Sequence, residues 1–191
     1  MVDPLALRLA STIRATARGL TDAFATPEST RNWLSTNASN VGAYRDVGDY
    51  LPTEQDRLAL VALRQSVRAI FAEAVAPHPP SSADANALPP FPEALAAVNQ
   101  AAAPILRQLT WDGGPSLDSR LLVAKDTEAY LAALAESAIE FFTGPLLPQL
   151  RVCPAPRCVL YFLKRHPRQE WCSTACGNRA RAARFYHQHR D

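Results

Sequence analysis

The clearest hydrophobic pattern in the chain runs from residue 54 to residue 76. Apolar residues recur there every three or four positions, which is the spacing of one face of an α-helix. Thr53 precedes the pattern with a hydroxyl that can cap the first free backbone amides, and Pro77 ends it. The predicted apolar face consists of Leu60, Leu63, Val67, Ile70 and Phe71, and the opposite flank carries Arg57, Arg64 and Arg68.

Three shorter segments also favour helices. Thr26 and Pro27 are typical of a helix cap and a first helical residue, and Trp33 and Leu34 then face the core. An alanine-rich helix is predicted over residues 93–103. The last helix begins at Asp126 or Thr127 and ends at Gly144. Its predicted apolar face consists of Tyr130, Leu131, Leu134, Ala138, Phe141 and Phe142.

The segments between these helices are less regular. Residues 5–17 are ambiguous between strand and helix, residues 37–48 favour a loop, and residues 77–92 form a proline-rich connector. Residues 105–111 and 117–123 flank the turn signal Asp-Gly-Gly-Pro, which predicts a β-hairpin. The predicted fold class is therefore mainly α with a small β-hairpin (α+β).

Charge and cysteine content predict two domains. Residues 1–150 hold 11 Lys+Arg and 16 Asp+Glu, a net charge of −5, whereas residues 151–191 hold 9 and 2, a net charge of +7. All four cysteines lie between positions 153 and 176. A charge difference that coincides with a change in motif content indicates modules with different partners. We expect a helix-rich domain over residues 1–147 and a cysteine-rich module over residues 148–191.

The chain shows no sign of membrane association or export. No segment approaches the ~18 consecutive apolar residues of a membrane-spanning helix. The first residues lack the basic and apolar segments of a secretory signal. We therefore expect a cytoplasmic protein with no membrane partner. In that reducing compartment, clustered cysteines bind metal more often than they form disulfides.

Cys153, Cys158, Cys172 and Cys176 form two closely spaced pairs that suggest one metal site. Each pair closes a short loop, and four thiolates satisfy the tetrahedral preference of a single structural Zn²⁺. Free buried thiols, a redox switch and an iron–sulfur cluster are the alternatives. Four sulfurs leave no open coordination position, so the predicted metal is structural. His166 lies between the pairs and can replace one sulfur, although a solvated loop residue is the simpler interpretation.

The spacing of the cysteines also predicts the shape of the module. We expect a knuckle over residues 153–158, a short hairpin over residues 159–170, and a helix that carries Cys176 near its start, as in a treble clef. Zinc bound by four thiolates has a net charge of −2, which nearby basic residues must compensate. Arg179 and its neighbour Asn178 are expected to support the sulfurs by hydrogen bonds. Arg157 and Lys164 are further candidates for charge compensation.

The C-terminal module closely resembles the CGNR zinc-finger family, named for the string found here as Cys176-Gly177-Asn178-Arg179. The resemblance includes Cys153-Pro154, Cys158, the aromatic-rich segment at residues 160–162 and Trp171-Cys172-Ser173. Many members have four residues between the last two cysteines, where this chain has three. The resemblance implies a zinc finger whose four ligands are the cysteines.

Members of that family usually have an N-terminal ABATE domain, which is associated with stress-induced transcription regulators. The layout of residues 1–145 resembles this domain more loosely, in the Trp33-Leu34 element, the long helix, the hairpin and the last helix. The family often has a Val-Asn-Thr string near its start, where this chain has Leu9-Ala10-Ser11-Thr12. Any ligand contact or hydrogen bond made by that asparagine is therefore absent from this chain.

The basic C-terminal end is the candidate nucleic-acid interface. Arg181, Arg184 and Gln188 share one face of the predicted helix, which is the pattern expected for phosphate contacts. Tyr186 lies roughly opposite and is expected to pack on the finger. In the alternative interpretation, the arginines only neutralise the zinc site or pair with the acidic first domain. The further candidate DNA contacts are Lys164, Arg165, Arg168 and Arg190.

Two functional hypotheses remain from the sequence. The first is a non-enzymatic transcription regulator whose finger contacts DNA and whose N-terminal domain senses a small-molecule effector or mediates assembly, for example as a homodimer. The second is a protein-interaction adaptor with a purely structural finger. No phosphate-binding glycine loop, HExxH-type metal motif or nucleophile–base pair is visible in the sequence, so an enzyme is not expected.

Overall fold

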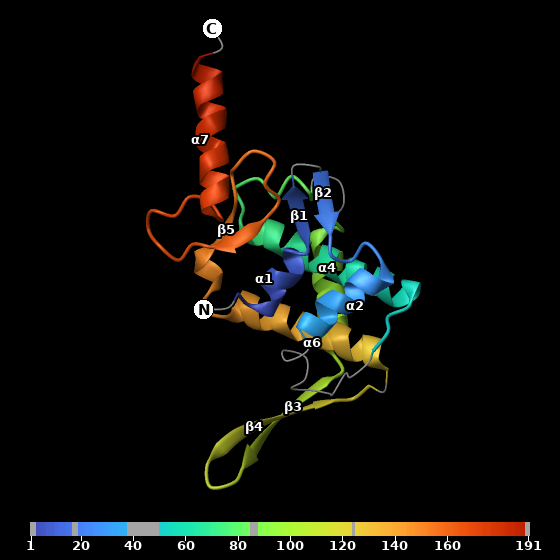
Figure 1. The fold of residues 1–191 in the computed structure, drawn as a ribbon. Coiled ribbons are helices and arrows are strands. Elements are labelled where there is room, and N and C mark those ends of the chain that lie inside the picture. The colour runs from blue at the N-terminus through green and yellow to red at the C-terminus, as the bar shows by residue number, and fades with distance from the viewer. Residues whose placement is uncertain (1–2, 17–18, 38–49, 85–87, 124, 190–191) are drawn as a thin grey trace.

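The computed structural model describes residues 3–16, 19–37, 50–84, 88–123 and 125–189. Figure 1 shows a helical body from which a β-hairpin and the C-terminal helix extend at opposite ends. Most of the loop predicted over residues 37–48 lies outside the described residues. The body consists of α1 (Leu5–Ala10), β1 (Ile13–Thr16), β2 (Gly19–Asp22), α2 (Pro27–Thr36), α4 (Glu54–Ala74), α5 (Phe91–Ala102), β3 (Ile105–Trp111), β4 (Pro115–Leu121) and α6 (Asp126–Thr143). The C-terminal part consists of η1 (Leu147–Gln149), β5 (Leu150–Val152), β6 (Tyr161–Leu163) and α7 (Thr174–Gln188).

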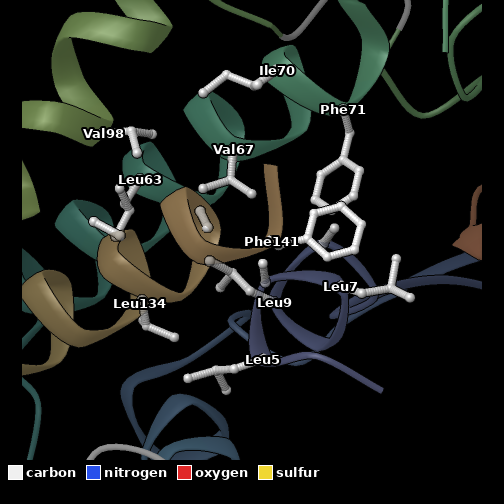
Figure 2. Packing of buried hydrophobic residues seen from close by; sticks show 14 of the residues in the cluster. Leu5, Leu7, Leu9, Leu63, Val67, Ile70, Phe71, Val98, Leu134 and Phe141 are labelled. Atoms are coloured by element: carbon white, nitrogen blue, oxygen red, sulfur yellow. The ribbon is translucent and has the colours of Figure 1, made fainter. Parts of the chain in front are cut away.

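The hydrophobic core lies between α1, α4, α5 and α6 (Figure 2). Phe71 of α4 packs against Phe141 of α6, with ring centroids 5.3 Å apart. The same ring stacks on Tyr161 of β6 at 5.2 Å. Leu150 and Leu163 of the C-terminal part belong to the same buried cluster. The cysteine-rich module is therefore packed against the helical body through a shared core.

The two best-marked helix starts have the predicted caps. The Thr26 and Thr53 hydroxyls accept hydrogen bonds from backbone amides three residues later, those of Ser29 and Asp56. In both cases the later side chain accepts a hydrogen bond from the capping residue's backbone amide, which completes a capping box. These helices begin where the sequence predicts, because each capping box involves only the capping threonine and the residue three positions later.

The ambiguous N-terminal segment is resolved as a short helix followed by a hairpin. Five of the six residues of α1 are buried, so apolar residues surround its axis and its helical period is masked. Strands β1 and β2 then pair antiparallel from Ile13↔Asp22 to Thr16↔Gly19. This hairpin was not predicted, since neither strand exceeds four residues or has a marked apolar face.

The predicted β3–β4 hairpin is confirmed, with its second strand shifted toward the turn. Trp111 pairs with Pro115, so only Asp112, Gly113 and Gly114 form the turn. Gly113 has φ of 67°, a left-handed conformation that glycine adopts without strain. Leu109, Trp111 and Leu117 lie on one face of the hairpin, and each is at least 60% exposed.

One expectation about α4 is wrong. Arg64 and Arg68 were predicted on a polar flank but are 2% and 0% exposed. Arg64 pairs with Asp22 of β2, and Arg68 pairs with Asp84 of the proline-rich connector. The carboxylates compensate the buried charges, and both partners lie outside the helix in sequence. The pattern within α4 alone therefore gives no signal for their burial.

Candidate metal centre

The first cysteine pair lies in the turn between β5 and β6. These strands pair antiparallel from Leu150↔Leu163 to Val152↔Tyr161. The Cys153 backbone amide donates to Leu160 O at 3.0 Å, and the Cys158 amide donates to Ala155 O at 2.9 Å. The knuckle is thus the turn of the hairpin, and the hairpin predicted over residues 159–170 is wrong. Residues 164–173 form a loop that leads to the second cysteine pair.

The second pair lies at the start of α7, as the sequence predicts. Ser173 caps this helix, and its hydroxyl accepts a hydrogen bond from the Cys176 amide at 3.3 Å. Cys172 precedes the cap and Cys176 lies in the first turn, so one helix start fixes both sulfurs. The Cys172 amide also donates to Cys153 Sγ at 3.5 Å, which ties the two pairs together.

The four sulfurs have the spacing of a tetrahedral zinc site. All four lie within 4.8 Å of one another. Cys158 Sγ is 3.7 Å from Cys172 Sγ, which is 3.5 Å from Cys176 Sγ. A tetrahedron with zinc–sulfur bonds of about 2.3 Å has sulfur–sulfur edges of about 3.8 Å. The donor set and the spacing of the sulfurs therefore fit Zn²⁺.

The thiols lie too close together to ionise independently. Hydrogen bonds from Cys158 and Cys172 lower the pKa of Cys153. Hydrogen bonding to Cys153 in turn raises the pKa of Cys158 and of Cys172. A divalent cation removes this restriction, because it stabilises all four thiolates at once. Cys153, Cys158 and Cys176 are buried, and Cys172 is partly exposed.

Arg179 is in direct contact with a sulfur. Its Nη2 donates to Cys176 Sγ at 3.0 Å, a charge-assisted contact that compensates part of the negative site. Asn178 is exposed, and its side-chain oxygen accepts a hydrogen bond from Arg181 at 2.6 Å. This contact of Asn178 is with another side chain of α7 and not with a sulfur. His166 is exposed and accepts a hydrogen bond from the Arg168 amide, away from the sulfur cluster.

Comparison with family models identifies both parts of the chain. The CGNR zinc-finger model matches residues 149–189. The ABATE model, described as "Putative stress-induced transcription regulator", matches residues 3–145, well over half of the chain. The chain belongs to the ABATE family. Its CGNR finger holds one structural Zn²⁺ on Cys153, Cys158, Cys172 and Cys176.

Three further findings concern relatives, the type of the matched families and membrane-spanning helices. A search of curated proteins gives no match to this ABATE-family chain. Both matched families are regulator or zinc-finger types, not enzyme families. Within the part of the chain that the structure describes, no helix combines the length and apolar character needed to cross a membrane.

The described candidate DNA-contacting residues lie either on α7 or in the loop before it. Arg181, Arg184 and Gln188 are exposed on α7, which Figure 1 shows extending away from the body. The guanidinium groups of Arg181 and Arg184 lie over the Trp171 ring, at 5.7 and 5.8 Å from its centroid. Tyr186, expected to pack on the finger, is instead 72% exposed, because α7 projects beyond the surface that it would contact.

Three other basic candidates, Lys164, Arg165 and Arg168, lie in the loop before α7. Arg168 is exposed, and Lys164 is partly buried with its backbone amide bonded to Gln149 O. Arg165 is exposed but forms an ion pair with Asp3 of the ABATE domain. Arg190 lies outside the described residues. The loop therefore offers one arginine already engaged by a carboxylate and one without such a contact among the described residues.

A buried polar network that sequence reasoning missed joins the finger to the ABATE domain. Arg68 of α4 donates to both oxygens of Asp84, to Ala10 O and to Val159 O just before β6. Tyr161 donates to Asp84 Oδ2 at 2.8 Å. Burial, followed by the charge and hydrogen bonding of Asp84, raises the pKa of Tyr161, so the phenol stays protonated as donor. The only sequence signal was an acid within a proline-rich connector.

Proposed function

We propose that this protein is a transcription regulator that binds DNA through α7 of its CGNR finger. The observation that supports the proposal is the exposed surface of α7. Arg181, Arg184 and Gln188 are solvent-accessible on a helix that projects from the body and has no acidic residue between positions 174 and 188. A helix of this kind fits the major groove of B-DNA, where arginine contacts phosphates or guanine edges.

The zinc site and the buried network both favour this use of α7. Zinc fixes the start of the helix through Cys176, and Arg68 fixes the finger on the ABATE domain through Val159 O. Trp171 lies under both guanidinium groups and limits their side-chain freedom. The arginines are thus positioned before DNA binds, which reduces the entropy lost on association. Residues 1–147 would act as the regulatory domain and residues 148–191 as the DNA-binding domain, in the cytoplasm.

The test compares two double variants of the zinc-loaded full chain. Arg181→Ala with Arg184→Ala removes two charges from α7, and Arg120→Ala with Lys125→Ala removes two exposed charges from β4 and the start of α6. We expect the first to weaken binding to promoter-length duplex DNA at least tenfold in fluorescence anisotropy, and the second less than twofold. Equal effects, or binding unchanged by the α7 variant, would contradict the proposal.

Binding of another protein through the β3–β4 hairpin is a second candidate function, and a separate observation supports it. Leu109, Trp111 and Leu117 expose a contiguous apolar face on a hairpin that Figure 1 shows extending from the body. Such a face on a two-stranded sheet is typical of a protein contact. If the chain is an adaptor and not a DNA-binding protein, Trp111→Ser should abolish partner binding while the α7 variant has no effect.

A further inference from the structure

A large cleft is lined by residues of both the ABATE domain and the finger. Its volume is about 970 Å³, at the upper end of the range of about 300–1,000 Å³ typical of small-molecule sites. Arg8, Arg14 and Trp33 line it from α1, β1 and α2, and Cys172 and Arg179 line it from the finger. The cleft is therefore shared between the two domains.

The charged groups of the cleft leave an excess of positive charge. Its two acids are already paired, Asp22 with Arg64 and Asp3 with Arg165. Among the described residues, the half-buried Arg8 forms no ion pair. Arg14 is exposed, and its Nε donates to a backbone oxygen, that of Ser11. Neither guanidinium is thus neutralised by a carboxylate in the described part of the chain.

The zinc site decides which end of the cleft attracts an anion. Zinc with four thiolates is an anionic group at the finger wall, and Arg179 compensates it through Cys176 Sγ. That arginine is already engaged by the zinc-thiolate group. Arg8 and Arg14 belong to the opposite wall, which the ABATE domain forms. Neither of them forms an ion pair among the described residues. Trp33 and Leu160 add apolar surface to the same cleft.

We propose that this cleft binds a small organic oxyanion, whose carboxylate or phosphate group pairs with Arg8 and Arg14 and whose apolar part contacts Trp33. The ligand would touch both the ABATE wall and the finger wall that leads into α7. A role of this ligand as an effector rests on the proposed DNA-binding function. Binding of the ligand to the cleft does not depend on DNA.

The experiment follows the three tryptophans of the zinc-loaded full chain by two-dimensional ¹H–¹⁵N NMR. Trp33 lines the cleft, Trp171 lies under the arginines of α7, and Trp111 is at the hairpin end as an internal control. The probes are phenyl phosphate, benzoate and the neutral analogue benzamide. We expect a saturable shift of the Trp33 indole signal with phenyl phosphate or benzoate, and none with benzamide at equal concentration. The two anions distinguish a phosphate from a carboxylate ligand.

Three outcomes would overturn the proposal: no saturable shift of Trp33, an equal shift with benzamide, or shifts confined to Trp171, which would place the anion on the DNA-binding face. Arg8→Ala with Arg14→Ala should weaken the anion at least tenfold, whereas Arg8→Lys with Arg14→Lys should retain binding. If the alanine variant fails to fold, the comparison between anion and neutral probe in the wild-type protein still decides. Loss of DNA binding in the α7 variant leaves this result unchanged, so the two proposals fail separately.

Discussion

Arg68 Nε donates to Asp84 Oδ1 at 2.6 Å, and the two side chains are 0% and 1% exposed. This ion pair lies where α4, the connector and the segment before β6 meet, because Arg68 also bonds Val159 O. The Arg68 guanidinium is 5.3 Å from the centroid of the Tyr161 ring. The attachment of the finger to the ABATE domain therefore depends on a compensated buried charge.

Removal of one partner of this pair should destabilise the whole protein. Asp84→Ala leaves Arg68 charged and unpaired in the core, which typically reduces the free energy of unfolding by about 3–5 kcal/mol. Glu54→Ala is the matched control, since it removes the exposed partner of Arg57 on the same helix. Urea unfolding followed by circular dichroism measures both. A loss for Asp84→Ala no larger than for the control would show that the network does not hold the domains together.

Zinc should be lost when one sulfur ligand is replaced. Cys172→Ser removes the sulfur that is 3.5 and 3.7 Å from two others. We expect the metal content of the purified protein, measured by atomic emission, to fall from one zinc per chain to near zero. Most of the helical signal should remain, because the main core is built from α1, α4, α5 and α6. A variant that keeps one zinc per chain would exclude the four-sulfur site.

The contact from Arg179 to Cys176 should strengthen zinc binding. Loss of a group that hydrogen-bonds a metal ligand typically reduces metal affinity 10–100-fold. Arg179→Ala should therefore release zinc at lower chelator concentration, as measured with a colorimetric zinc indicator. Arg181→Ala is the control, since Arg181 bonds Asn178 and not a sulfur. Equal release from the two variants would assign Arg179 no part in the site.

Asp22 should make stability depend on acid pH. Burial opposes its ionisation, but hydrogen bonds from Arg64 and the Phe24 amide, with the Arg64 and Arg57 charges, lower its pKa below the usual 3.8. The ionised form thus stabilises the folded state above pH 3.8, and this contribution is lost as the pH falls through the lowered pKa. Asp22→Asn should be less stable than wild type at pH 7, and the difference should shrink toward pH 3 in parallel urea titrations. A difference independent of pH would contradict this.

The features predicted from sequence are those set by near neighbours. The caps at Thr26 and Thr53, the hairpin turn at Gly113 and the cysteine spacing each act over a few residues. Arg68 was misplaced because its partners Asp84 and Val159 are 16 and 91 residues away. The finger hairpin was misplaced because β6 pairs with β5 across the knuckle, so the cysteine loop serves as the hairpin turn. The Arg8–Arg14 cleft has no sequence motif at all.

The most direct test of the DNA-binding account is the salt dependence of affinity. Fluorescence anisotropy of the zinc-loaded full chain with promoter-length DNA, from 50 to about 200 mM salt, gives the slope of log K against log salt concentration. The account predicts a negative slope in the wild type, reduced in magnitude by about 1.8 in the Arg181→Ala, Arg184→Ala double variant if each arginine contacts one phosphate. No binding at low salt, or the same slope in both proteins, would contradict it.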